Sequence, residues 1–261
     1  MANSSLYDKN IASKYDKDGF VAPINVMTPE EARDLLIDFE AAERELANQP
    51  ERLALLKSYP NQLLPSFDAL TRNPKLINAA SSVLGPDLMV WSAALFIKEK
   101  NSEKIVSWHQ DLTYWGLDDI QETTCWFALS EASEEAGCMK FVPGTHKTKI
   151  VEHIDTFAEN NLLTRGQEIA VDVNESEAVA AALSAGQASM HHGLLFHSSG
   201  PNKTDHRRIG SAIRYIKPSM KQETGDLSLV TLVSGQDHFN NFKIANSPKG
   251  RLLEEEFELC R

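Results

Sequence analysis

The order of hydrophobic and polar positions divides the chain into a helical N-terminal part and a strand-rich remainder. Thr28 is a residue suited to cap a helix, Pro29 takes the first helical position and Glu31 the capping-box position, and apolar residues then recur at helical spacing. A second helix is expected at about 74–84, and a short helix followed by an apolar strand within 10–25. The N-terminal third is therefore predicted to be mainly helical.

From about residue 88 the pattern changes to short apolar stretches separated by turn residues. Strands are predicted at 88–98, 123–129, 139–142, 188–191 and 209–216. Short strands spaced in this way are typical of a sandwich or barrel, and helices that precede them are expected to cover one major sheet from outside. The predicted fold class is mainly β with flanking helices.

No repeat, low-complexity tract or linker interrupts the sequence, so a single domain is expected over 1–261. Within it, N-terminal helices are expected at about 10–85 and the strand core at about 88–218. Residues 150–185 are polar at first and rich in alanine at the end, and we expect an insertion there rather than part of the core.

Composition and charge narrow the classes of partner. The net charge of −11 argues against a nucleic-acid or anionic-membrane surface, and no apolar run is long enough to span a membrane. Cys125, Cys138 and Cys260 form no zinc-binding pattern and fit a reducing compartment, with the first two expected as core thiols. Residues 1–5 show no secretory signal. We expect a cytoplasmic protein with a small-molecule substrate, and the sequence holds no signal for its oligomeric state.

The segment Trp-His-Gln-Asp at 108–111 contains the first candidate metal ligands. His109 and Asp111 are two residues apart, so on a β-strand both side chains would point to the same face. One imidazole and one carboxylate are two of the three ligands of a facial triad for non-haem Fe(II). The third ligand is expected to be a distant histidine.

Three downstream histidines are candidates for that third ligand, namely His191, His192 and His197. If 188–197 forms one strand, His191 and His197 face one side and His192 the other, and this spacing alone leaves the choice open. Arg208 follows His197 after eleven residues, and a planar guanidinium near the metal suits a cosubstrate with a carboxylate.

With these residues in view, the chain resembles the phytanoyl-CoA dioxygenase family of Fe(II)- and 2-oxoglutarate-dependent oxygenases. The resemblance rests on YDKDGFV at 15–21, WHQD at 108–111, WFALS at 126–130, AGCMKFVPGTH at 136–146, HSSGPNKT at 197–204 and Arg208. It implies a double-stranded β-helix, the cupin-like jelly roll, that holds one Fe(II) and uses 2-oxoglutarate and O₂ as cosubstrates.

The resemblance also implies roles for individual residues. By their match to the family pattern, the iron ligands are His109, Asp111 and His197, and the residue that pairs with the far carboxylate of 2-oxoglutarate is Arg208. Further cosubstrate contacts are implied at Ser199 and Trp126. Related halogenases have Gly or Ala in place of the carboxylate at 111, so its presence favours hydroxylation over halogenation.

Several residues are expected near the substrate. Tyr114 and Trp115 follow the first two ligands and suit a pocket wall, since each is an aromatic side chain with a polar tip. Lys98 and Arg214 are basic residues inside apolar strands, so each is expected to meet an anionic ligand or a neighbouring carboxylate. His192 is a further candidate, because a histidine near the metal can orient ligand or substrate.

The loops at 112–121 and 150–180 and the region 217–245 are expected to determine specificity, whereas His153 has no partner pattern and is expected to be solvated. The predicted activity is hydroxylation of an unactivated C–H bond of a small polar molecule, such as an aminoalkylphosphonate or amino acid, with release of succinate and CO₂. The alternatives are desaturation, cyclisation or epimerisation with the same cofactors, or a non-catalytic metal-binding jelly roll.

Overall fold

The computed structural model describes residues 7–224 and 228–261. Its helices are α1 (Lys9–Asp18), α2 (Pro29–Glu45), α3 (Pro50–Ser58), α4 (Pro60–Leu63), α5 (Pro65–Thr71), α6 (Pro74–Leu84) and α7 (Glu254–Leu259). Its strands are β1 (Phe20–Asn25), β2 (Leu88–Lys98), β3 (Val106–His109), β4 (Glu122–Ala128), β5 (Met139–Phe141), β6 (His153–Asp155), β7 (Gln167–Ile169), β8 (Val179–Ala181), β9 (Gln187–His191), β10 (His197–Ser199), β11 (Arg208–Ile216), β12 (Leu229–Ser234) and β13 (Lys243–Ile244). Short 3-10 turns are η1 (Asp111–Thr113), η2 (Thr145–Lys147) and η3 (Glu175–Glu177). Residues 1–5, considered above for a secretory signal, and 225–227, part of the region 217–245, lie outside the described residues.

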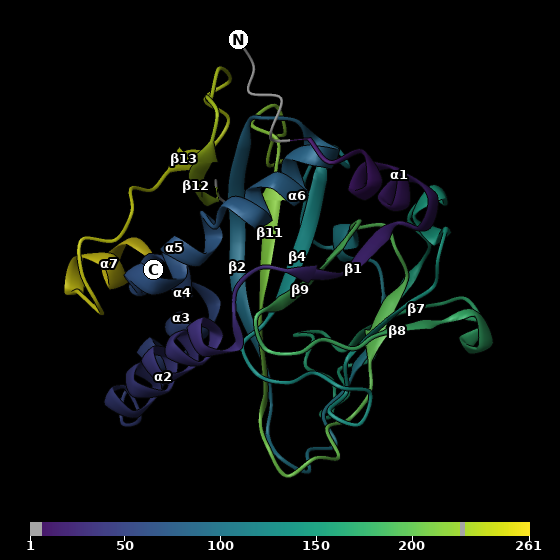
Figure 1. Ribbon diagram of the computed structural model, residues 1–261, viewed down its shortest axis with the longest axis horizontal. Coiled ribbons are helices and arrows are strands. Elements are labelled where there is room, and N and C mark those ends of the chain that lie inside the picture. Colours follow the sequence, from purple (N-terminus) through teal and green to yellow (C-terminus); the bar gives the residue numbers. More distant parts are fainter. Residues whose placement is uncertain (1–6, 225–227) are drawn as a thin grey trace.

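Two sheets face each other and form the strand core. The larger sheet has seven strands in the order β1-β9-β4-β11-β2-β12-β13, and the smaller has four in the order β3-β10-β5-β8. The helices α2 to α6 cover the outer face of the larger sheet, and the smaller sheet lies on its inner side (Figure 1). The mainly β fold with flanking helices is therefore confirmed. None of the described helices has the length and apolar character needed to cross a membrane.

Strand β11 shows how the sequence separates the hydrophobic core from the interior between the sheets. Its side chains alternate, because successive residues of a strand face opposite sides. Ile213 and Tyr215 are fully buried in the core beneath the helices. Arg208, Ala212 and Arg214 instead line a cavity between the two sheets. The basic residues in this apolar strand thus lie on its inner face.

The predicted helix signals agree with the structure where the helices are long. At the start of α2, Thr28 and Glu31 form both hydrogen bonds of the capping box, and α6 has the predicted bounds. The short helices α3, α4 and α5 were not predicted. Each begins with proline at its first positions, which is typical of the start of a helix. The apolar pattern after each proline is too short to predict a helix by its spacing.

The strand predicted at 188–191 is confirmed as β9, but it does not continue to 197, because β9 ends at His191 and β10 begins at His197. The insertion predicted at 150–185 does not extend that far, since β8 pairs with β5 as the edge of the smaller sheet. The segment before β8 does form a separate two-stranded sheet, β6 with β7.

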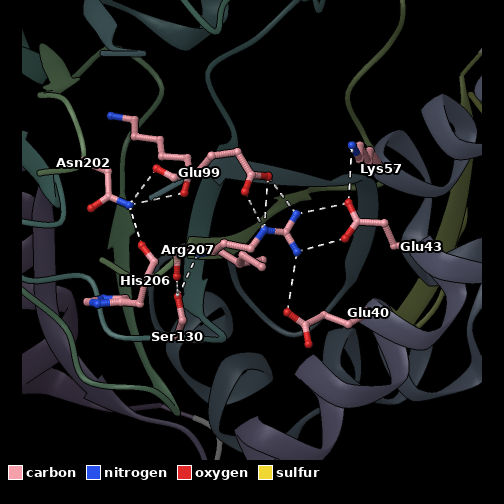
Figure 2. Close-up of polar contacts among 10 residues, drawn as sticks. Glu40, Glu43, Lys57, Glu99, Ser130, Asn202, His206 and Arg207 are labelled. Carbon is pink, nitrogen blue, oxygen red and sulfur yellow. Dashed lines mark hydrogen bonds and ion pairs between the residues drawn. The ribbon is translucent and has the colours of Figure 1, made fainter. Parts of the chain in front are cut away.

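A cluster of ion pairs centred on Arg207 fastens α2 to the strands (Figure 2). The Arg207 guanidinium donates to Glu43 of α2 at 2.9 Å and to Glu99, which follows β2, also at 2.9 Å. Glu40 and Lys57 complete the cluster, each at 3.5 Å from its partner. Arg207 is therefore engaged on the helix side of the sheet.

Candidate metal centre

His109, Asp111 and His197 come together at one end of the cavity between the sheets. Their potential ligand atoms all lie within 4.8 Å of one another, and all three residues are buried. The Asp111 Oδ1 atom is 3.4 Å from His109 Nε2 and 3.8 Å from His197 Nε2. The antiparallel pairing of β3 with β10 places His197 directly opposite His109.

The strand expected to carry both His109 and Asp111 ends before Asp111, although the two side chains do meet. Strand β3 ends at His109, and Asp111 begins the turn η1, so the two residues do not share a strand. Gln110 keeps an extended backbone, with φ −117° and ψ 130°, so the carboxylate still lies on the same side as the imidazole before the chain turns at η1.

Hydrogen bonds at the far side of both imidazoles determine which nitrogen is available to a metal. His109 Nδ1 lies 2.9 Å from the Ser107 carbonyl, and His197 Nδ1 lies 2.9 Å from the Leu195 carbonyl. A carbonyl only accepts, so each Nδ1 carries the proton and each Nε2 presents a lone pair toward Asp111. Burial lowers the pKa of His197 well below its usual value, which favours the neutral, ligating form.

Burial raises the pKa of Asp111, but its contacts with the surrounding imidazoles and the nearby charge of Arg214 outweigh burial and hold the pKa well below its usual value. Thr124 donates a hydrogen bond to Oδ2 at 3.3 Å. Two neutral imidazoles and one carboxylate are a donor set that suits Fe(II) with open coordination positions.

Gln110 fixes the segment between the two ligands. Its amide nitrogen donates to the Leu194 carbonyl at 2.9 Å, and its amide oxygen accepts from Val151 N–H at 2.9 Å. His153 is half-buried rather than solvated, and its Nε2 accepts the Gln110 backbone N–H at 3.0 Å. The segment before β6 is thereby fastened to the metal-binding turn.

His191 is a fourth imidazole beside these residues. Its Nε2 lies 3.6 Å from Asp111 Oδ2, and neither ring nitrogen has a hydrogen-bond partner among the described residues. His192 faces away, as the alternation predicts, and its Nδ1 accepts the Leu194 N–H at 3.0 Å. Of the two neighbours, only His191 lines the cavity.

Two buried cations lie at the other side of the metal ligands. Arg208 donates to the Gly137 carbonyl at 3.0 Å and to Ser199 Oγ at 3.3 Å, and Lys98 Nζ donates to the same Oγ at 2.6 Å. Arg208 also stacks over the Trp126 ring at 5.1 Å. Arg208, Ser199 and Trp126 are thus assembled around one point, as their predicted roles require.

The positive charges of Arg208 and Lys98 are not balanced by a carboxylate of the described residues. Burial lowers the pKa of Arg208 to about 10, and burial together with the nearby Arg208 lowers the pKa of Lys98 to about 6. Among residues 7–224 and 228–261, neither cation has a carboxylate within ion-pair distance. Lys98 therefore lies with Arg208 rather than with the predicted substrate residues. A bound anion would supply the missing negative charge.

The remaining predicted substrate residues are placed differently from one another. Arg214 lines the cavity, and its guanidinium lies 4.9 Å from the Trp115 ring. Tyr114 is half-buried, is not part of the cavity lining in the described structure, and donates to Asp155 at 2.9 Å. His192 does not border the cavity within the described part of the chain.

Sequence reasoning missed several cavity-lining positions that have no motif of their own. They are Phe96, Val106, Thr124, Met139, Ser198 and Ala212. It also missed Glu122, a buried carboxyl that accepts the Gly193 N–H. Alternation along β4 and β11 is the signal that identifies Thr124 and Ala212, once the inner face is known.

Comparison with known proteins identifies the family. The family model for phytanoyl-CoA dioxygenase (PhyH) matches residues 15–210. The chain therefore belongs to the phytanoyl-CoA dioxygenase family of Fe(II)- and 2-oxoglutarate-dependent oxygenases, as the motifs predict.

Individual relatives agree with this assignment. The probable alpha-ketoglutarate-dependent hypophosphite dioxygenase of Stutzerimonas stutzeri is 28% identical over 159 residues, which are 60% of this chain and 54% of that protein. The ectoine dioxygenase of Bordetella parapertussis is 28% identical over 146 residues, 51% of this chain and 47% of that protein. The chain thus spans about half the length of these curated relatives.

Solved structures confirm the jelly-roll fold. The apo form of ThoJ, a non-heme monooxygenase, is 33% identical with a TM-score of 0.86, and the match covers 95% of this chain and 92% of that chain. The epimerase SnoN, in complex with Fe3+, alpha ketoglutarate and nogalamycin RO, is 21% identical with a TM-score of 0.67 over 83% of this chain and 86% of that chain. At that identity, the second likeness supports the fold alone.

Proposed function

We propose that this protein is an Fe(II)- and 2-oxoglutarate-dependent dioxygenase that hydroxylates an unactivated C–H bond of a small polar molecule. The observation that supports this most strongly is the position of the His109–Asp111–His197 cluster beside Arg208 and Lys98, which lack a carboxylate partner in the described structure. A bound metal accounts for the His–Asp–His cluster, and a dicarboxylic cosubstrate accounts for the two cations. A non-catalytic metal-binding jelly roll would account only for the cluster and not for the two cations.

Each residue has a defined part in this proposal. His109, Asp111 and His197 hold Fe(II), and the bound iron supplies the redox chemistry that couples 2-oxoglutarate and O₂ to oxidation of the C–H bond. The cluster offers three ligands, so open positions remain for the keto acid and for O₂. In the overall reaction, one oxygen atom enters succinate with release of CO₂, and the other enters the hydroxylated product.

The far carboxylate of 2-oxoglutarate is held by Arg208, Lys98 and Ser199. The Trp126 ring covers one face of the Arg208 guanidinium and excludes water from that side. Binding of the carboxylate favours the charged form of Lys98, whose pKa burial lowers to about 6 in the unliganded cavity.

The size of the cavity favours a small substrate. Its empty space is about 420 Å³, part of it open to solvent, and this space has to hold 2-oxoglutarate as well. Ligand pockets of drug-sized molecules range from roughly 300 to 1,000 Å³, so little room is left for a second large molecule. An amino acid or an aminoalkylphosphonate is the substrate class we favour, and the carboxylate of Asp111 favours hydroxylation.

A different outcome with the same cofactors is the second candidate. The match to SnoN, an epimerase with the same fold, shows that this scaffold is not restricted to hydroxylation. Analysis of the product by mass spectrometry distinguishes the candidates, since hydroxylation adds one oxygen atom whereas epimerisation, desaturation and cyclisation add none.

The test of the proposal is formation of succinate from 2-oxoglutarate and O₂ by protein reconstituted with Fe(II). Amino acids, betaines, aminophosphonates and acyl-CoA thioesters are supplied as separate pools, and Asp111→Ala serves as the control. We expect one of the polar pools to increase succinate formation and to yield an oxygenated product. Succinate formation that stays at the level of Asp111→Ala with every pool would contradict the proposal.

A further inference from the structure

Strand β11 places a second arginine at the opposite end of the cavity from Arg208. Arg214 is six residues further along the strand and lies on the same inner face. At about 3.3 Å per residue, the two Cα atoms are roughly 20 Å apart. Thr124, the partner of Arg214 on β4, donates to Asp111, so Arg214 lies at the end of the cavity that holds the metal cluster.

The contacts of Arg214 leave part of its guanidinium free. Its Nη1 donates to Ser92 Oγ at 3.1 Å, and the Trp115 ring covers one face at 4.9 Å. Its Nε is buried and has no hydrogen-bond partner in the described structure. The sequence allowed either an anionic ligand or a neighbouring carboxylate as partner for this charge. Within residues 7–224 and 228–261, no carboxylate lies within ion-pair distance of Arg214, which favours the anionic ligand.

Two carboxyl groups are near enough to influence Arg214 without contacting it. Asp111 is engaged by Thr124 and by the neighbouring imidazoles. Glu122 accepts the Gly193 N–H, and burial, reinforced by Asp111, raises the pKa of Glu122 well above its usual value. Its other oxygen, Oε2, has no hydrogen-bond partner in the described structure, so neither carboxyl group occupies the free edge of Arg214.

The local backbone is shaped around this arginine. Arg214 pairs with Ser92, but the next residue, Tyr215, pairs with Val90, so Trp91 is an extra residue that forms a β-bulge. Trp91 stacks on Trp115 at 5.0 Å, and Trp115 in turn covers Arg214. A bulge and two stacked indoles thus hold the guanidinium at the cavity wall.

We propose that Arg214 is the docking point for an anionic group of the primary substrate, a carboxylate or a phosphonate. The substrate anion binds the free edge of the guanidinium, and the C–H bond to be oxidised lies between Arg214 and the metal. The cavity then has two anion subsites, one for the cosubstrate and one for the substrate. This inference rests on the proposed function and adds the substrate class to it.

The test measures binding rather than turnover. Protein loaded with Fe(II) and saturating 2-oxoglutarate is titrated calorimetrically, without O₂, with butanoate, propylphosphonate and the neutral butanamide. Wild type is compared with Arg214→Gln, with Arg214→Lys, and with Arg33→Gln, which removes an exposed arginine of α2. The carboxylate and phosphonate arms distinguish the two kinds of anion.

We expect wild type and Arg33→Gln to bind at least one anion about tenfold or more tightly than butanamide. Arg214→Gln should lose this preference and keep the wild-type affinity for 2-oxoglutarate, while Arg214→Lys should keep part of the preference, which also shows that the site tolerates substitution. An equal affinity for anions and amide in wild type, no measurable anion binding at millimolar concentration, or a preference unchanged in Arg214→Gln would overturn the inference. Failure of wild type to bind 2-oxoglutarate would instead contradict the proposed function.

Discussion

Gly210 provides a steric test of the cosubstrate site that alters no polar group. A Cβ atom at Gly210 would lie 2.0 Å from Cζ2 and 2.3 Å from Cη2 of Trp126, distances that packed atoms do not adopt. Trp126 is only 4% exposed, so its ring has little room to move away. The φ angle of Gly210 is outside the left-handed region, and alanine therefore adds no backbone strain there. Gly210→Ala should displace the indole on which Arg208 stacks.

The expected size of the effect follows from the cost of overpacking. Inserting a methyl group into a packed interior costs about 1–3 kcal/mol. If the displaced ring moves Arg208 out of position, most of this cost is felt in 2-oxoglutarate binding, and each 1.4 kcal/mol corresponds to about tenfold in affinity. We therefore expect the dissociation constant of 2-oxoglutarate to rise about ten- to a hundredfold. Affinity for Fe(II) alone should stay close to wild type, because the metal ligands lie on β3, η1 and β10 rather than on β11 or β4.

The assay is anaerobic calorimetric titration of Fe(II)-loaded protein with 2-oxoglutarate, together with denaturant unfolding of the apoprotein. Gly200→Ala is the matched control, since a Cβ at Gly200 meets no atom within 4 Å. Wild-type 2-oxoglutarate affinity in Gly210→Ala, with an unchanged free energy of unfolding, would refute the packing of Trp126 against this position and its support of Arg208.

Three further substitutions test neighbouring parts of the account. Arg208→Gln should weaken 2-oxoglutarate binding by about 2–5 kcal/mol, whereas Arg207→Gln should lower the free energy of unfolding and leave that binding unchanged; titration showing the reverse order would exchange their roles. His191→Phe should keep Fe(II) affinity within the range of wild type, and a loss as large as that of His109→Ala in equilibrium metal binding would instead make His191 a ligand. Burial lowers the pKa of His192 to about 4, so the unfolded state, with its usual pKa of about 6.5, binds the proton more tightly. Stability from this group is complete above pH 6.5 and is lost as the pH falls toward 4, by up to about 3 kcal/mol. His192→Asn should lack this part of the pH dependence in urea unfolding, and an identical pH dependence in both proteins would contradict it.

The sequence predicted those features that depend on local signals. The capping box at Thr28 and Glu31 and the stop at Gly85 give α2 and α6 their bounds. Alternation in 209–216 predicted β11, and the motifs supplied the residues that meet at the candidate metal centre. These signals can be recognised because each lies within a few residues of the feature it determines.

Features that depend on pairing between distant segments could not be predicted in this way. His191 and His197 meet because β9 and β10 belong to sheets that face each other, not because they share a strand. Lys98 lies beside Arg208 because the register of β2 with β11 pairs these two residues. A basic residue in an apolar strand indicates that an anion binds nearby, but the strand register decides which residues lie beside the basic residue.

The position of Asp111 likewise depends on contacts between segments that are distant in the sequence. A strand that continued past His109 would place Asp111 on the same face by alternation. The chain instead turns at η1, which Gln110 stabilises through contacts to two loops distant in the sequence. The short His-x-Asp motif does not contain those contacts, so it predicts the ligands and not the backbone that positions them.

The central claim is that His109, Asp111 and His197 hold an Fe(II) ion to which 2-oxoglutarate binds directly. The most direct measurement is the visible metal-to-ligand charge-transfer band that forms when 2-oxoglutarate is added to Fe(II)-loaded protein without O₂. Wild type and His206→Gln, which alters a partly exposed histidine outside the site, should develop this band, and alanine at any of the three ligands should abolish or strongly reduce it. Absence of the band in wild type, or its full intensity in Asp111→Ala, would contradict the account.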